Sequence, residues 1–195
     1  MGKVQTGRVI EFYSNSCLVD INGQKLPCSI LGKQDIVVGD NVFLEYQNDK
    51  DIKSIIITSR AKRLSKLNKK GLRNSKAIAA NISHVGILLV QNPKTSTEFI
   101  DKWIVSALAS NIKPFIINNK IDIDIDAEYA QKLKIYKDLD IKVFDVSAKK
   151  GDGIDSLQKY LENKCTIFVG NSGAGKSTLT SKLTGKDIKT KSLSN

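Results

Sequence analysis

The feature that most constrains the fold of this 195-residue chain is a glycine-rich loop near its C-terminal end. The loop reads Gly170-Asn171-Ser172-Gly173-Ala174-Gly175-Lys176-Ser177. It follows the apolar run 166–169 and precedes Leu179 and Leu183, which are spaced for one face of a helix. The pattern G-x-x-x-x-G-K-[ST] between a strand and a helix is typical of a phosphate-binding loop. The sequence therefore predicts an α/β fold with a phosphate site at this loop.

The residues of this loop have distinct expected roles. Glycine lets consecutive backbone N–H groups converge on a phosphate, and the helix N-terminus adds partial positive charge. We expect residues 170–178, including Thr178, to bind a nucleotide cofactor. Lys176 is placed to reach the β- and γ-phosphates, and the Ser177 hydroxyl is placed to bind Mg²⁺. Lys176 and Ser177 are therefore the candidate catalytic residues, and Ser177 is the candidate metal ligand.

The chain before this loop alternates between strand and helix patterns from residue 77 onward. Apolar runs predict strands at 85–90, 115–117, 141–146 and 166–169. Apolar residues at helical spacing predict helices around 99–108, 129–139 and 154–161, with a fourth after the loop. Repeated strand–helix units are typical of a mostly parallel sheet that is covered on both faces.

Two further segments follow predicted strands. Asn119-Lys120-Ile121-Asp122 follows the second strand, and Ser147-Ala148-Lys149 follows the third. The Asp122 carboxylate can accept hydrogen bonds from guanine N1–H and the 2-amino group, whereas adenine offers neither donor. Lys120 can lie along the base plane, Asn119 can tie the loops together, and the Ala148 N–H can reach guanine O6. Because ligands bind at the carboxyl ends of parallel strands, both segments and the phosphate loop are expected along one sheet edge.

The first part of the chain has a different pattern. Between residues 7 and 58, short alternating runs separated by turns predict five strands. Asn22-Gly23 is a strong hairpin signal because a type I′ turn needs positive φ at both central positions. Five short strands in this length favour a small closed barrel of the OB type.

Charge points to an anionic partner. The chain carries 31 Lys and Arg against 20 Asp and Glu, a net charge of +11. Between Arg60 and Lys76 there are eight basic residues and no acid. The plain interpretation is a solvated linker, and the alternative is contact with nucleic-acid phosphates.

Secreted and membrane classes are not supported by the sequence. The first residues lack the apolar stretch of a secretory signal, and no apolar run approaches the roughly 18 residues of a membrane span. The three cysteines, Cys17, Cys28 and Cys165, are scattered and odd in number. They form no disulfide framework and suit a reducing compartment, so we expect a cytoplasmic protein.

The order of the motifs carries a family resemblance. The base-reading segments precede the phosphate loop, whereas in ordinary GTPases the phosphate loop comes first. Together with the barrel, this order resembles the small ribosomal subunit biogenesis GTPases (the RsgA family), which are circularly permuted. Gly39-Asp40 followed by Val42, Ser59-Arg60 with Leu64, and the run 76–82 match as well. The resemblance implies an OB-like RNA-binding barrel over 1–60, a basic linker over 61–76 and an incomplete, circularly permuted G domain over 77–195.

The resemblance also implies an activity. Family members bind GTP or GDP with Mg²⁺, hydrolyse GTP on the 30S ribosomal subunit and act in its late maturation, contacting 16S rRNA. A monomer is expected.

The chain departs from the family pattern after the phosphate loop. Only 17 residues follow Thr178. The single D-x-x-G match, Asp20 to Gly23, falls in a predicted turn, and no Cys/His cluster for zinc is present. Zinc is expected only in the family's C-terminal domain. We therefore expect an N-terminal portion that is inactive in hydrolysis by itself.

Three functional hypotheses remain open at this point. The first is a permuted GTPase. The second is a guanine-nucleotide-gated or plain RNA-binding module without hydrolysis. The third is a P-loop ATPase or kinase in which residues 119–122 are incidental.

Overall fold

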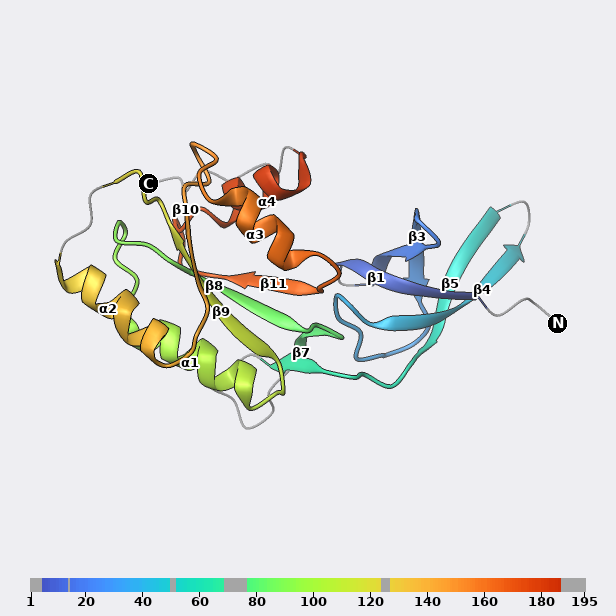
Figure 1. Ribbon diagram of the computed structural model, residues 1–195. Helices are drawn as coiled ribbons and strands as arrows, with labels where there is room; N and C mark the ends of the chain where they lie inside the picture. Colours follow the sequence, from blue (N-terminus) through green and yellow to red (C-terminus); the bar gives the residue numbers. More distant parts are fainter. Residues whose placement is uncertain (1–4, 14, 50–51, 69–76, 124–126, 187–195) are drawn as a thin grey trace. The chain divides into compact units, whose positions relative to one another are not determined.

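The computed structural model describes residues 1–195 except 1–4, 14, 50–51, 69–76, 124–126 and 187–195 (Figure 1). The chain divides into two compact units, Met1–Ile82 and Ser83–Asn195. Residues 77–82, which the sequence pattern assigns to the start of the G domain, belong to the first unit. Each unit is described by itself below.

The first unit contains a closed five-stranded barrel. Its strands are β1 (Gln5–Tyr13), β2 (Ser16–Ile21), β3 (Gln24–Ile30), β4 (Asn41–Asp49) and β5 (Ile52–Arg60). The strand order is β1-β2-β3-β5-β4, with β3 and β5 parallel and the other neighbours antiparallel. The predicted OB-like barrel is confirmed.

The barrel follows from local sequence. Asn22 and Gly23 have φ values of 52° and 87°, and Asp20 Oδ1 accepts a hydrogen bond of 2.8 Å from the Gly23 N–H. This is the hairpin turn that the sequence predicts, so the D-x-x-G match there is structural. Alternate residues of the strands fill the interior, with Val19 and Leu44 fully buried.

A second hairpin lies in the region expected to be a linker. Residues 66–68 form β6 (Lys66–Asn68), which pairs antiparallel with β7 (Ala77–Ala80). Leu67 is fully buried, which explains why this part of the basic stretch is ordered against the unit. Within the expected linker, residues 66–68 thus form a paired strand. The rest of the stretch, residues 69–76, lies outside the described residues.

The exit from the barrel is fixed by a buried ion pair. Arg63 Nε lies 2.7 Å from Asp40 Oδ1, and Arg63 Nη2 donates to Asp40 Oδ2 at 2.7 Å. The Asp40 side chain is fully buried and also accepts from the Val37 N–H at 2.9 Å. The paired carboxylate raises the pKa of the Arg63 guanidinium above its ordinary value.

The second unit is a layered α/β structure. Its elements are β8 (His84–Leu89), α1 (Thr97–Leu108), β9 (Lys113–Asn119), α2 (Ala127–Asp138), β10 (Val143–Val146), α3 (Ile154–Leu161), β11 (Thr166–Val169) and α4 (Lys176–Thr184). The strands form a parallel sheet in the order β10-β9-β8-β11. Helices α1 and α2 cover one face, and α3 and α4 cover the other (Figure 1). The four predicted strands and their parallel arrangement are confirmed.

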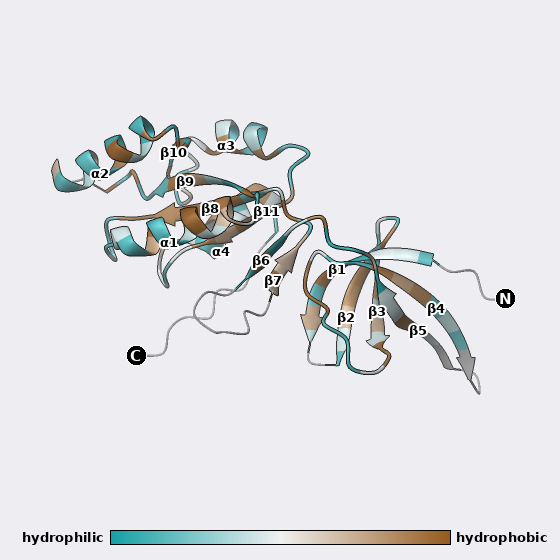
Figure 2. Ribbon diagram, turned by 90° about the horizontal axis from the view of Figure 1, so that it is seen from below, coloured by the Kyte–Doolittle hydropathy of each residue, from teal (hydrophilic) through white to brown (hydrophobic). Residues whose placement is uncertain are grey.

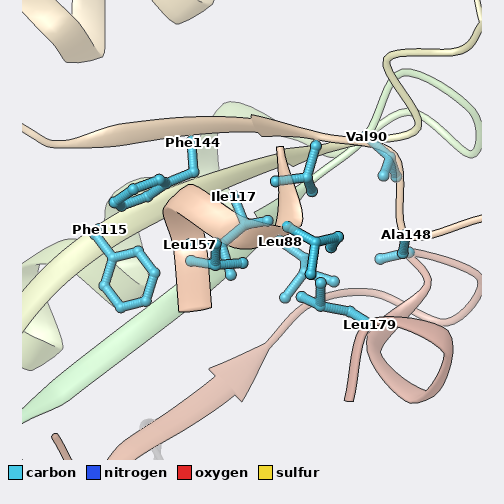
Figure 3. Packing of buried hydrophobic residues seen from close by; sticks show 11 residues of the cluster. Leu88, Val90, Phe115, Ile117, Phe144, Ala148, Leu157 and Leu179 are labelled. Atoms are coloured by element: carbon cyan, nitrogen blue, oxygen red, sulfur yellow. The ribbon is translucent and has the colours of Figure 1, made fainter. Parts of the chain in front are cut away.

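One hydrophobic cluster of this unit lies between the sheet and helices α3 and α4. Phe115, Leu88, Leu157 and Leu179 converge there from two strands and two helices (Figure 3). In Figure 2 the sheet strands carry mostly hydrophobic colour, whereas the helices carry mixed colour. Gly86 is required in this layer, because a Cβ there would lie 2.7 Å from the Phe168 ring and 2.8 Å from that of Phe115.

Two apolar residues that the helical spacing predicts to face the core are instead exposed. Leu108 is 58% exposed and Leu139 is 65% exposed. Both lie where a helix ends and the chain returns to the next strand of the sheet. Among the helices of the described residues, none has the length and apolar character needed to cross a membrane.

Candidate nucleotide-binding site

The three segments singled out by the sequence meet at one edge of the sheet. Residues 119–122 begin at the last residue of β9, residues 147–149 follow β10, and residues 170–178 follow β11 and open α4. All three strands are parallel. Their carboxyl ends therefore present the three loops on the same side, the expected position for a ligand in an open α/β sheet.

Asn119 joins the other two segments. Its Nδ2 donates to the Ala174 carbonyl at 2.9 Å, and its Oδ1 accepts from the Ala148 N–H at 3.0 Å. Asn119, Ala148 and Ala174 are all buried. One amide side chain thus satisfies a donor and an acceptor that would otherwise be unpaired in the interior, and it holds the loops in register.

Gly175 makes this bridge possible. Its φ is +88°, a conformation that favours glycine, and a Cβ there would lie 2.4 Å from Asn119 Nδ2. A side chain at this position would displace the amide that the loops share. Gly175 is therefore fixed both by backbone conformation and by the close approach of Asn119.

The phosphate loop curls around the base of helix α4. Lys176 Nζ lies 2.7 Å from the Gly170 carbonyl and 2.8 Å from that of Asn171. Ser177 is half-buried in the first turn of α4, Thr178 is exposed in the same turn, and Ser172 is exposed at the loop tip. The lysine ammonium and the helix N-terminus thus face the same small region.

Asp122 and Ser147 form the contact between the two base-side segments. The Ser147 hydroxyl donates to Asp122 Oδ1 at 2.7 Å. This hydrogen bond, with smaller contributions from Lys150 and Lys149, lowers the pKa of the Asp122 carboxyl below its ordinary value. The carboxylate is therefore ionised at neutral pH and can act as a hydrogen-bond acceptor. Lys149 is exposed beside it, and Ile121 is 37% exposed.

A fourth loop at this edge was not predicted. Lys120, at φ +69°, donates from Nζ to the Asn92 carbonyl at 2.8 Å. A Cβ on Gly173 would lie 3.3 Å from Pro93 Cδ. The loop after β8 therefore contacts both the base-side segment and the phosphate loop. The Asn-Pro turn signal at the end of a predicted strand could have indicated it.

A buried network behind the base-side segments was also missed. Tyr129 donates from its hydroxyl to Asn118 Oδ1 at 2.6 Å, and Asn118 Nδ2 donates to Asp145 Oδ1 at 2.7 Å. These residues link α2, β9 and β10 directly behind Asn119. Burial raises the pKa of Tyr129 well above its ordinary value, so its hydroxyl remains a donor. No sequence spacing identifies such a network.

The residues present suit a nucleoside triphosphate with Mg²⁺. Glycines at positions 173 and 175 adopt positive φ, so the loop backbone lines the region next to Lys176 without side chains in the way. The donor set is a backbone cradle, one ammonium and one hydroxyl, Ser177, which is the chemistry that a phosphate–Mg²⁺ group requires. Among the described residues, no three His, Cys, Asp or Glu side chains gather as a metal site of their own.

Comparison with known sequences gives a consistent result. The sequence profile of the RsgA GTPase family matches residues 57–195. A small ribosomal subunit biogenesis GTPase RsgA from Flavobacterium psychrophilum is 33% identical over 191 residues, covering 89% of this chain and 59% of the relative. One from Ectopseudomonas mendocina is 32% identical over 189 residues, covering 92% of this chain and 54% of the relative. The chain thus spans little more than half the length of these curated relatives.

Solved structures agree with the sequence comparison. YjeQ from Thermotoga maritima superposes with a TM-score of 0.73 at 30% identity, covering 95% of this chain and 67% of that one. YloQ, described as a circularly permuted GTPase, superposes with a TM-score of 0.65 at 22% identity, which supports the fold. Since the family profile covers all three loops and the sheet that carries them, this chain belongs to the RsgA GTPase family.

Proposed function

We propose that this chain is the guanine-nucleotide-binding part of a GTPase that acts in assembly of the small ribosomal subunit. The observation that carries the proposal is the Asn119 bridge, which fixes the phosphate loop at Ala174 and the base-side loop at Ala148 in one arrangement. The bridge joins the segment that contains Asp122, the candidate guanine-reading residue, to the phosphate loop. The bridge therefore favours a guanine nucleotide over the alternative in which residues 119–122 are incidental.

Each segment has a separate task in this proposal. The Asp122 carboxylate, kept ionised by the Ser147 hydroxyl, accepts from guanine N1–H and the 2-amino group. The backbone of residues 170–175 and the Lys176 ammonium hold the phosphates, and Ser177 holds the Mg²⁺, which neutralises charge on the phosphate oxygens. Binding energy at the base orients the γ-phosphate relative to the loop.

The ribosomal part of the proposal rests on the relatives. The curated relatives are named as small ribosomal subunit biogenesis GTPases. We propose that the intact protein hydrolyses GTP as a cytoplasmic monomer on the 30S subunit and contacts 16S rRNA. The net charge of +11 supports contact with a polyanion. We expect zinc only in the part of the relatives that this chain does not span.

Base specificity provides the test. Asp122→Asn should weaken GTP and GDP binding roughly 10- to 100-fold, because hydrogen bonds to a charged acceptor are worth about 1.5–3 kcal/mol. Xanthosine nucleotides should gain, since the new amide N–H can donate to the 2-carbonyl. Asp155→Asn, an exposed carboxylate at the start of α3, is the matched control and should change neither.

Competition binding with guanosine, xanthosine and adenosine diphosphates separates the hypotheses. Unchanged GDP preference in Asp122→Asn would remove Asp122 from the base pocket. Preference of the unaltered chain for ADP would favour the ATPase or kinase. Guanine binding by the intact protein without 30S-stimulated turnover would favour the non-hydrolysing, nucleotide-gated RNA-binding alternative.

A further inference from the structure

A second polar region lies at the opposite edge of the same sheet, where the strands begin. A cavity of about 730 Å³ opens there. Its lining includes Ser83, His84, Lys113, Lys142 and Tyr160. None of these residues belongs to the three nucleotide loops, which follow the other ends of the strands. The cavity is therefore separate from the candidate nucleotide site.

Strand register places several of these polar residues in one row. His84 is paired with Thr166 on β11 and with Lys113 on β9. Side chains two residues apart share a face of a strand. Thr166 and Lys113 therefore lie on the same face as Phe168 and Phe115, which pack against the core covered by α3 and α4. These polar residues therefore lie on the same face of the sheet as that apolar layer, two residues nearer the beginning of each strand.

Two lysines converge on the aromatic ring at the end of this row. Lys142 Nζ lies 4.6 Å from the centroid of the Tyr160 ring, and Lys164 Nζ lies 4.5 Å from it. Lys164 also donates to the Tyr160 carbonyl. The ring of His84 meets the Tyr160 ring edge-on at 5.7 Å. Both ammonium groups thus lie against the Tyr160 ring, which also contacts His84.

The lysines of this cluster, Lys113, Lys142 and Lys164, form no ion pair with a neighbouring carboxylate among the described residues. Asp140 is the acidic residue among those that line the cavity. Burial, and then Lys164 and Lys113, lower the pKa of His84, so these two lysines act on the same imidazole. Lys113 and Lys142 in the cavity lining, and Lys164 next to Tyr160, therefore surround a neutral histidine.

An unused hydroxyl lies in the same row. Thr166 Oγ1 is buried and has no hydrogen-bond partner. A buried hydroxyl without a partner costs free energy, and this one lies next to His84 in the register. Thr166 is not part of the cavity lining, so the candidate donors for phosphate oxygens are the ammonium groups.

We propose that this lysine cluster is a second RNA-binding site, at which Lys113, Lys142 and Lys164 contact backbone phosphates. The proposal rests on the proposed ribosomal function, which supplies RNA as the polyanion. RNA is favoured over an acidic peptide because Lys113 and Lys142 line one cavity, which suits a compact phosphate group, and Lys164 lies beside it at the Tyr160 ring. Exposed Leu108 and Leu139 at the cavity rim can contact the face of an unpaired base.

The salt dependence of RNA binding tests this site. The double variant Lys113→Gln/Lys142→Gln should flatten the slope of log affinity against log salt by about 1.4, at about 0.7 per lost phosphate contact on single strands. The same change corresponds to roughly 25-fold weaker binding at about 0.1 M salt. The probes are a fluorescein-labelled single-stranded RNA and isolated 30S subunits, titrated with the full chain.

Lys102→Gln/Lys134→Gln is the matched control. Both lysines are exposed, lie on α1 and α2, and give the same change in net charge. A loss of slope in the first double variant but not in the control supports the site. Equal slopes in both variants overturn it while leaving RNA binding itself intact. Loss of binding to a polyglutamate peptide with unchanged RNA binding assigns the cavity to an acidic protein instead. No binding of RNA or 30S by the unaltered chain overturns both this site and the proposed ribosomal function.

Discussion

Gly175→Ala is the substitution that most directly tests how the nucleotide loops are held together. The new Cβ would lie 2.4 Å from Asn119 Nδ2, a distance that side-chain atoms do not tolerate. The backbone of residue 175 itself, at φ +88°, would also be strained by a side chain. Because Asn119 donates to the Ala174 carbonyl, the amide must move away from an acceptor that is buried.

The expected cost has two parts. A left-handed conformation in a residue with a side chain costs about 1–2 kcal/mol. Leaving a buried carbonyl without its donor costs about 1–3 kcal/mol. Gly175→Ala should therefore destabilise the second unit by about 2–5 kcal/mol. Gly151→Ala is the control, since its φ is +100° but the nearest atom to its Cβ is Lys182 Nζ at 4.0 Å. The control should show only the cost of the left-handed backbone conformation, about 1–2 kcal/mol.

Urea unfolding followed by tryptophan fluorescence measures the difference. Trp103 is the only tryptophan of the chain and lies on α1, so its signal reports on the second unit. Guanine-nucleotide affinity, measured in parallel, should fall in Gly175→Ala and remain in Gly151→Ala. Equal destabilisation by the two variants would show that Asn119 moves without cost, and would refute the bridge as the element that holds the loops.

Two further predictions concern charge in the interior. Burial lowers the pKa of His84, so between that value and about 6.5 the unfolded chain binds a proton that the folded chain does not, and stability falls as pH drops below about 6.5. His84 is the only histidine, so His84→Phe should remove the difference in urea midpoint between about pH 7 and pH 5.5, and a persisting difference would assign it to other groups. Arg63→Met should destabilise the first unit by about 3–5 kcal/mol, because it leaves the buried Asp40 carboxylate unpaired. Hydrogen exchange of the barrel amides measures this, and an equal effect of Lys62→Met, at an exposed position, would contradict it.

Local patterns were sufficient for most elements of the structure. The strand at 166–169 and the helix at 154–161 were predicted with the observed bounds, because the first is an apolar run that ends at a glycine-rich loop and the second has helical periodicity. The same holds for the position of Asn119, since the carboxyl end of a parallel strand specifies where a ligand-binding loop lies. Their assigned roles in nucleotide binding stay predictions.

Long-range pairing could not be predicted in the same way. Strand β6 has one buried apolar residue, Leu67, within a basic stretch, so its pairing with β7 leaves no periodic signal. The row that joins Thr166, His84 and Lys113 depends on β11 lying beside β8. That order reflects how the whole sheet assembles, and no window of sequence contains it.

The order of the strands has a consequence for synthesis on the ribosome. β11 is made after β8, β9 and β10, yet it pairs with β8, and the hydrogen bond from Asn119 to Ala174 spans 55 positions. A growing chain can therefore assemble β8, β9 and β10 while one edge of β8, whose residues are all buried in the finished unit, still lacks its neighbour. Until β11 and α4 have left the exit tunnel, the phosphate loop between them cannot pack against the base-side loops. By this reasoning, nucleotide binding requires that β11 and α4 have been made, and bound nucleotide stabilises only chains in which both halves of the site have already folded.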